Sequence, residues 1–167
     1  MQMDIVYIKV IKLNRKAFTL VEILIVVAII AMLAALAIPN LMLARLNANE
    51  SVAQGTLKVV STACENFRVA HSPMVFPDNL QVLITATPPY LDGSIDTGTS
   101  GSPKNGYNFT YTRINEQQYV CSATPSIYTI TGRRTFSINE TGLLRAVDNN
   151  AAEIVTEGAY ETMTVVQ

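Results

Sequence analysis

The sequence predicts an α+β protein in which a long N-terminal helix packs on a small antiparallel β-sheet of about four strands. From Phe18 to Ile38 the chain is apolar apart from one ionisable side chain. From residue 41 to about residue 70, apolar residues recur at helical spacing. After Gly106, short stretches alternate apolar and polar residues, as half-buried strands do. The 167 residues suit one globular domain behind a helical extension.

Residues 1–17 form a short basic segment, which we interpret as a leader peptide. Its net charge is +3, whereas the 8 basic and 12 acidic residues from position 18 onward give −4. The leader's charges are Lys9, Lys12, Arg15 and Lys16 against Asp4. A basic flank keeps that side of a membrane segment in the cytoplasm. The chain from position 18 onward is acidic and creates no positive electrostatic potential that would attract nucleic acid. We therefore expect no nucleic-acid partner.

The apolar run over 18–38 is long enough to cross a membrane. Its 21 residues make a helix of about 31 Å, against a hydrocarbon core of about 30 Å. Glu22 is its one ionisable residue. A carboxylate costs about 2.5–3.5 kcal/mol at the centre of such a helix and less near an end. We therefore expect Glu22 to have a partner.

Two ordinary interpretations of this run remain open from the residues alone. In the first, it is a secretory signal peptide cut after Ala37, because Ala35-Leu36-Ala37 has the small-x-small pattern of a cleavage site. The run is longer than the usual apolar core of such signals, and Glu22 lies inside it. In the second, it is a plain membrane anchor that opens with the T-x-x-E capping box from Thr19 to Glu22.

A more specific interpretation comes from the order of several features. The basic leader ends at Arg15-Lys16-Ala17, Phe18-Thr19-Leu20-Val21-Glu22 follows, and the apolar run closes at Ile38-Pro39. This order resembles the N-terminal signature of type IV pilins and of the pseudopilins of type II secretion systems. The resemblance is close from Arg15 to about Leu46 and looser beyond, and it implies the pilin fold.

The resemblance also implies processing. A prepilin peptidase would cut between Ala17 and Phe18 and then methylate the new amine of Phe18. The family usually has glycine before the cut, and this chain has Ala17, which is also small. Glu22 would meet the N-terminal amine of a neighbouring subunit and so set the register of assembly. Because a paired buried charge is held strongly whereas a lone one is penalised, this role suits its position.

The function implied is that of a structural subunit of a type IV pilus-like filament. The partners would be identical or homologous pilin subunits, the prepilin peptidase, an inner-membrane assembly platform, and membrane lipid before assembly. The protein would start in the inner membrane with a cytoplasmic N-terminus and end in an extracellular or periplasmic filament. The alternatives are a type II secretion pseudopilin, a competence filament subunit and, more distantly, a membrane-anchored or secreted binding domain or enzyme.

The helix is expected to span 18–71. Pro39 lacks a backbone N–H and predicts a kink rather than a stop, because helical periodicity resumes at once. The resumed helix carries an apolar stripe, and most of its charged residues, Glu50 among them, are expected off that stripe. The stripe consists of Ala53, Leu57, Val60, Cys64 and Phe67.

The globular domain is expected over 72–167. Residues 72–105, rich in proline and glycine, predict a loop region with a short helix near Asp78–Leu83. The resemblance implies that this region is the variable loop between helix and sheet. The antiparallel sheet is expected over 106–147. Residues 148–167 either add one strand near 162–166 or form a tail.

Cys64 and Cys121 are expected to point toward the same interface between helix and sheet. A disulfide between them, 57 residues apart, would contribute about 3–4 kcal/mol in the chain-entropy model. The alternative is two buried thiols.

No motif for catalysis, a cofactor or a metal stands out, so we do not expect an enzyme, and His71 has no clustered partner. Residues Asp148, Asn149, Asn150 and Glu153 are the nearest analogue of a calcium loop found in some pseudopilins, but spacing alone does not define an oxygen cage.

Overall fold

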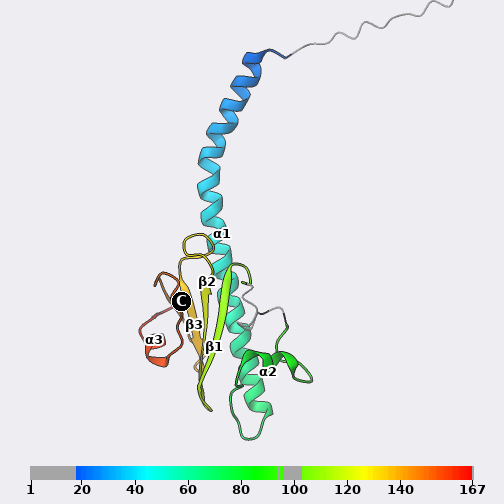
Figure 1. Ribbon diagram of the computed structural model, residues 1–167, viewed down its shortest axis with the longest axis vertical. Helices are drawn as coiled ribbons and strands as arrows, with labels where there is room; N and C mark the ends of the chain where they lie inside the picture. The colour runs from blue at the N-terminus through cyan, green and yellow to red at the C-terminus, as the bar shows by residue number, and fades with distance from the viewer. Residues whose placement is uncertain (1–17, 94, 96–102, 167) are drawn as a thin grey trace, which may run out of the picture. The chain divides into compact units, whose positions relative to one another are not determined.

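The computed structural model of the protein describes residues 18–93, 95 and 103–166, so the expected leader lies outside the described residues. Figure 1 shows a long helix followed by a small sheet with two short helices. The elements are α1 (Leu20–Ala70), α2 (Leu80–Thr85), β1 (Tyr107–Asn115), β2 (Gln118–Pro125), β3 (Thr135–Asn139), β4 (Leu144–Val147), α3 (Glu157–Glu161) and β5 (Thr164–Val165).

Helix α1 is continuous, yet the chain divides at Pro39 into two compact units. Within the first unit, nearly all the apolar side chains of residues 20–39 are exposed. By length and composition α1 could cross a membrane. Pro39 lies inside the helix and does not end it; the kink expected there stays a prediction.

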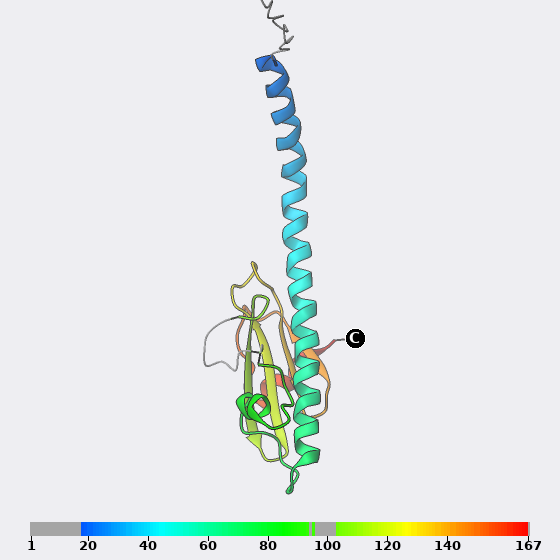
Figure 2. The same cartoon turned by 90° about the vertical axis from the view of Figure 1, so that its right-hand side faces the viewer.

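The second unit, residues 40–167, contains α1 from Asn40 onward and the whole sheet. The sheet is antiparallel, in the order β1-β2-β3-β4-β5. Helix α1 lies along one face of it (Figure 2). All five residues of the predicted stripe are buried in one core with Tyr107, Tyr119, Phe136 and other strand residues. The predicted α+β fold is therefore confirmed, with a short fifth strand added.

The opposite face of the sheet is covered by the last twenty residues. Strands β2 and β3 are buried on both faces. Tyr160 of α3 packs there with Val120, Ile154 and Met163. β5 pairs with β4, so this segment is a structured cover rather than a tail. The face carries buried polar side chains, such as Thr135, whose hydroxyl donates to Asn149 Oδ1 at 2.9 Å.

Candidate functional site

The start of α1 forms the capping box expected from the sequence. The Thr19 N–H and the Thr19 hydroxyl donate to Glu22 Oε2 at 2.9 Å and 2.8 Å. In return, the Glu22 N–H donates to Thr19 Oγ1 at 3.2 Å. Two backbone N–H groups at the helix start thereby gain acceptors. Glu22 therefore has a hydrogen-bond partner, Thr19, within its own chain. The assembly interpretation alone gave it only the amine of a neighbouring subunit.

The residues expected to act in assembly lie close together in the chain and are open to solvent. Phe18 is 81% exposed, and Glu22 is exposed one turn later. Ala17 lies outside the described residues, so the cleavage position stays a prediction. The exposed carboxylate of Glu22, close to the exposed Phe18, can meet a group on another chain, provided that it exchanges its hydrogen bonds from Thr19.

A second carboxylate on α1, Glu50, ties the helix to the segment between β2 and β3. Its Oε2 accepts hydrogen bonds from Arg134 Nε at 2.8 Å and from a terminal guanidinium nitrogen at 2.6 Å. Its Oε1 accepts from the N–H groups of Arg133 at 3.2 Å and Arg134 at 3.3 Å. Glu50 is only 6% exposed. The Arg134 guanidinium also lies over the ring of Phe136, 5.1 Å from its centroid.

The expectation that Glu50 lies off the apolar stripe was wrong, because its side chain is buried with the stripe residues of α1. Glu50 precedes Ala53 by three residues and so continues the 3,4 spacing of the stripe onto the buried side of α1. Its charge suggested solvent, but its position in the helical repeat already indicated burial. A buried carboxylate needs a cation and hydrogen-bond donors, and residues 133–134 supply both.

Cys64 and Cys121 are both free thiols buried in the core between α1 and the sheet. Both side chains lie in the interface expected for them, and the choice between a disulfide and two buried thiols stays a prediction. Burial raises the pKa of the Cys64 thiol to about 12 and that of Cys121 well above its ordinary value. The rings of Tyr111 and Tyr119 stack beside them with centroids 5.4 Å apart. Burial raises the pKa of both phenols as well.

The remaining candidates are occupied by structural bonds. Asp148 accepts from the Tyr128 hydroxyl at 2.7 Å and from Arg133 at 3.1 Å, and Glu153 accepts from Thr110 at 2.8 Å. His71 stacks on the ring of Phe67, with centroids 3.9 Å apart. Within the described residues, no three metal-ligating side chains cluster.

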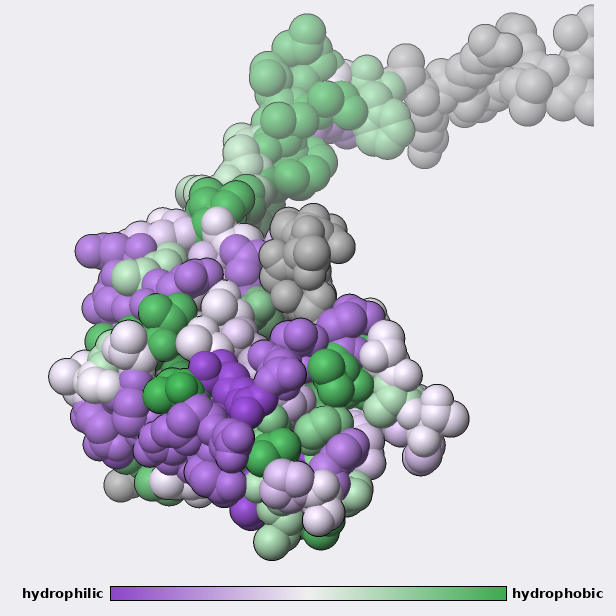
Figure 3. All heavy atoms as spheres, turned by 60° about the horizontal axis from the view of Figure 1, so that its bottom comes forward, coloured by the Kyte–Doolittle hydropathy of each residue, from purple (hydrophilic) through white to green (hydrophobic). Residues whose placement is uncertain are grey.

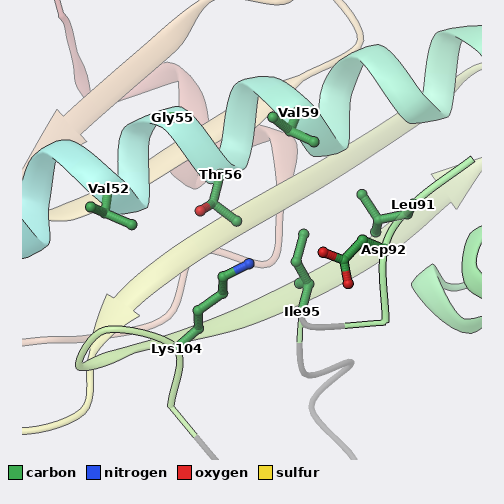
Figure 4. A pocket seen from close by; sticks show the side chains of 8 residues that line it. All are labelled: Val52, Gly55, Thr56, Val59, Leu91, Asp92, Ile95 and Lys104. Carbon is green, nitrogen blue, oxygen red and sulfur yellow. The ribbon is translucent and has the colours of Figure 1, made fainter.

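An open groove of about 490 Å³ lies along α1 at the edge of the core (Figure 4). Val52, Gly55 and Val59 form its helical wall, and the opposite wall comes from residues after α2, including Leu91 and Ile95. A side chain at Gly55 would meet no atom within 4 Å. The groove therefore leaves apolar helix surface open to another molecule.

Comparisons with known proteins give two findings. Residues 12–38 match the family model for the prokaryotic N-terminal methylation motif. The chain is also similar to the type IV wide pilus major component PilA4 of Thermus thermophilus. The two are 38% identical over 93 residues, which cover 53% of this chain and 70% of that protein.

Proposed function

The chain belongs to the type IV pilin family, and on that premise we propose that it is a structural subunit of a type IV pilus-like filament. The observation that carries this proposal is the exposed apolar start of α1 with a single carboxylate one turn after Phe18. Such a surface needs either lipid or other apolar helices around it. Before assembly lipid would cover it, and afterwards the helices of neighbouring subunits would.

We propose the following sequence of states for Glu22. In the membrane, its carboxylate keeps the two bonds from Thr19. Cleavage before Phe18 then creates a charged amine on each subunit. In the filament, the carboxylate of one subunit pairs with the amine of its neighbour. Because that pair is buried among apolar helices, a shifted register would leave two unpaired charges, which is strongly penalised.

The processing step is tested by mass spectrometry of the mature protein. We expect a chain that begins at N-methylated Phe18, released by a prepilin peptidase. An N-terminus at Ile38 would identify an ordinary signal peptide instead, and an intact leader would identify a plain anchor. Either of these results would contradict the filament proposal.

The role of Glu22 in assembly is tested by comparing it with its capping partner. Glu22→Gln and Glu22→Ala should leave membrane insertion unchanged and lower filament yield at least tenfold, because the neighbour's amine loses its counter-charge. The matched control is Thr19→Val, which removes the capping hydroxyl but keeps the carboxylate. It should weaken the helix start by about 1 kcal/mol and still allow filaments.

If Thr19→Val and the Glu22 variants lose filaments equally, Glu22 acts only as a helix cap. Normal filament levels from Glu22→Ala would likewise contradict the assembly role. Insertion is measured by membrane fractionation, and filaments are measured by shearing and electron microscopy.

A pseudopilin of a type II secretion system is the alternative within the same family. The two roles differ in what a deletion removes. Loss of surface filaments with normal protein secretion supports the pilus, and blocked secretion with normal surface filaments supports the pseudopilus.

A further inference from the structure

The cover over the sheet face opposite α1, residues 148–166, is held by few apolar contacts. Four buried apolar residues form the cluster at this interface: Val120, Ile154, Tyr160 and Met163. The sheet side of the interface is polar instead, and its buried polar side chains are Ser122, Thr124, Thr135, Ser137 and Asn139. Because apolar burial is the main force that holds segments together, we expect the cover to open more easily than α1 does.

Hydrogen bonds from α3 fasten the cover to the start of β4. The Tyr160 hydroxyl donates to the Leu143 carbonyl at 2.7 Å. One terminal nitrogen of Arg145 donates to the Glu161 carbonyl at 2.8 Å, and the other pairs with the Glu161 carboxylate at 3.1 Å. The Arg145 guanidinium also lies over the ring of Tyr160, 4.6 Å from its centroid. These bonds hold α3 without any contribution from Glu157, its first residue.

The carboxyl group of Glu157 has only one of its two oxygens bonded. Glu157 Oε1 accepts from Asn139 Nδ2 at 3.0 Å. Glu157 Oε2 is buried and has no hydrogen-bond partner in the described part of the chain. The same is true of Oε2 of Glu140, the residue that follows Asn139. A buried acceptor without a donor is unfavourable, and here two such acceptors flank one asparagine.

The surroundings of Glu157 favour its protonated form. Burial is the largest cause of its raised pKa, and the charges of Glu140 and Glu161 raise this pKa further. The hydrogen bond from Asn139 and the charge of Arg145 act in the opposite direction without reversing the shift. These four residues face Glu157 from the turn after β3, from α3, from β3 and from β4. A proton on Glu157 removes one of the like charges and creates an O–H group that can donate to Glu140.

Solvent has access to the edge of the cover. Figure 1 shows α3 toward the end of the globular unit that comes forward in Figure 3, and the surface at that end is mainly hydrophilic. Glu161 is exposed at the end of α3. A proton from water can therefore reach the neighbourhood of Glu157 when the pH falls.

We propose that a proton on Glu157 closes the cover: the protonated carboxyl group donates a hydrogen bond to Glu140, and loss of the proton lets residues 148–166 open as a unit. Opening separates β5 from β4 and so exposes the backbone edge of β4. The inference concerns the globular unit alone and does not rest on filament assembly.

The direction of the pH effect follows from the raised pKa of Glu157 in the closed form. In the open form this carboxyl has its ordinary pKa, about 4.5. The closed form therefore binds the proton more tightly, and closure strengthens as the pH falls from 7 toward 4.5. Below that value both forms hold the proton, so the gain levels off.

The test is amide hydrogen exchange of the full chain in detergent, followed by mass spectrometry at pH 7 and pH 5. Exchange rates are corrected for their intrinsic dependence on pH. Peptides from the cover report its opening, because the N–H groups of Tyr160 and Val166 donate hydrogen bonds in the closed form. Peptides around the buried Leu57 of α1 are the internal reference. We expect protection of the cover to rise at least threefold from pH 7 to pH 5, relative to α1.

Glu157→Gln imitates the protonated carboxyl group, since its amide is neutral and can donate. It should protect the cover at pH 7 as well as the unchanged chain does at pH 5, and the pH dependence should disappear. Glu140→Gln supplies a donor from the other side and should at least halve the pH dependence. The matched control is Glu153→Gln, which removes a carboxylate of the cover that bonds to Thr110 on β1 and should keep the full pH dependence.

Equal protection of the cover at pH 7 and pH 5 in the unchanged chain overturns the proposal. An equal rise in α1 does so too, because it would assign the effect to the whole globular unit. If Glu157→Gln loosens the cover at both pH values, Glu140→Gln decides, and an unchanged pH dependence in that variant rejects the shared role of the two carboxyl groups.

Discussion

A single buried carboxylate, that of Glu50, holds the loop between β2 and β3 (residues 126–134) against α1. The Glu50 side chain is 8% exposed and that of Arg134 is 47% exposed, so the pair is desolvated on one side only. Oε1 is the acceptor for two backbone N–H groups. Removing the carboxylate would leave those groups without an acceptor, which costs more than losing a solvent-exposed ion pair.

We expect Glu50→Gln to lower the free energy of unfolding by about 1–3 kcal/mol, because a neutral amide cannot balance Arg134 and keeps only one acceptor oxygen. The control is Glu65→Gln, which removes a more exposed carboxylate that pairs with Arg68 within one turn of α1. It should change stability by less than about 0.5 kcal/mol. Urea unfolding in detergent, followed by circular dichroism, measures both; equal losses would mean that Glu50 acts as an ordinary surface charge.

At the scale of elements, α1 combines three surfaces in one helix. Its first half is apolar and exposed, the inner side of its second half is packed on the sheet, and the outer side forms a wall of the groove. Gly55 lies on that wall in the interior of the helix, where glycine is unfavourable relative to alanine. Packing against the sheet does not require a small residue at Gly55. The lower helix stability that glycine causes there is therefore not explained by packing.

Gly55→Ala should therefore raise the free energy of unfolding by about 0.5–1 kcal/mol, since it restricts the unfolded chain and meets no atom. Gly132→Ala is the contrasting variant, because its new methyl group would collide with the buried ring of Tyr107. That variant should lose about 1–3 kcal/mol. The same urea unfolding measurement applies. A loss of stability in Gly55→Ala would show that this part of α1 is packed more closely than described.

At the scale of the whole molecule, the junction between α1 and the sheet gathers four titratable side chains in one interior. These are Cys64, Tyr111, Tyr119 and Cys121, and burial is the largest cause of the raised pKa of each. Each favours its neutral form when folded. The unfolded chain ionises first, so the stability from these groups is complete below their ordinary pKa values and is lost at higher pH.

We expect the free energy of unfolding to be flat in pH between about 7 and 8 and to fall from about pH 9, the ordinary pKa of a thiol, toward pH 12. Cys64 alone should contribute a loss of about 1.4 kcal/mol at pH 10. Cys64→Ala should reduce the slope between pH 9 and 10, before tyrosine ionises in the unfolded chain. Urea midpoints measured from pH 7 to pH 10 test this, and a flat profile up to pH 10 would contradict it.

The sequence predicted the fold well where periodicity was undisturbed. The stripe of α1, the short helix near Leu80 and four strands followed from spacing alone. The last twenty residues were predicted only as one strand near 162–166 or a tail. β5 matches the first alternative, but the cover over Thr135 and Ser137 was not predicted. Their burial depends on a cover with no strong pattern of its own. Glu50 was missed for a related reason, since its cation lies 84 residues away in the chain.

The candidate site, like the fold, was only partly predicted from the sequence. Thr19 and Glu22 are three residues apart, so their mutual capping could be predicted from the sequence. The two cysteines were placed in one interior, but spacing does not determine oxidation state. No sequence pattern predicted that the loop between β2 and β3 is bound to α1. The hydrogen bond from Asn49 to Thr131 joins residues 82 positions apart in the chain.

The capping box has a consequence for the reversibility of polymerisation. In the filament that we propose, a subunit that returned to the bilayer would regain the hydrogen bonds from Thr19 to Glu22, so its carboxylate would keep two donors in the hydrocarbon. The free-energy difference between stored and polymerised subunits is reduced by that amount. A polymer whose subunits are stabilised by only a small free-energy difference can release and reuse them. Thr19 would contribute part of that free-energy difference.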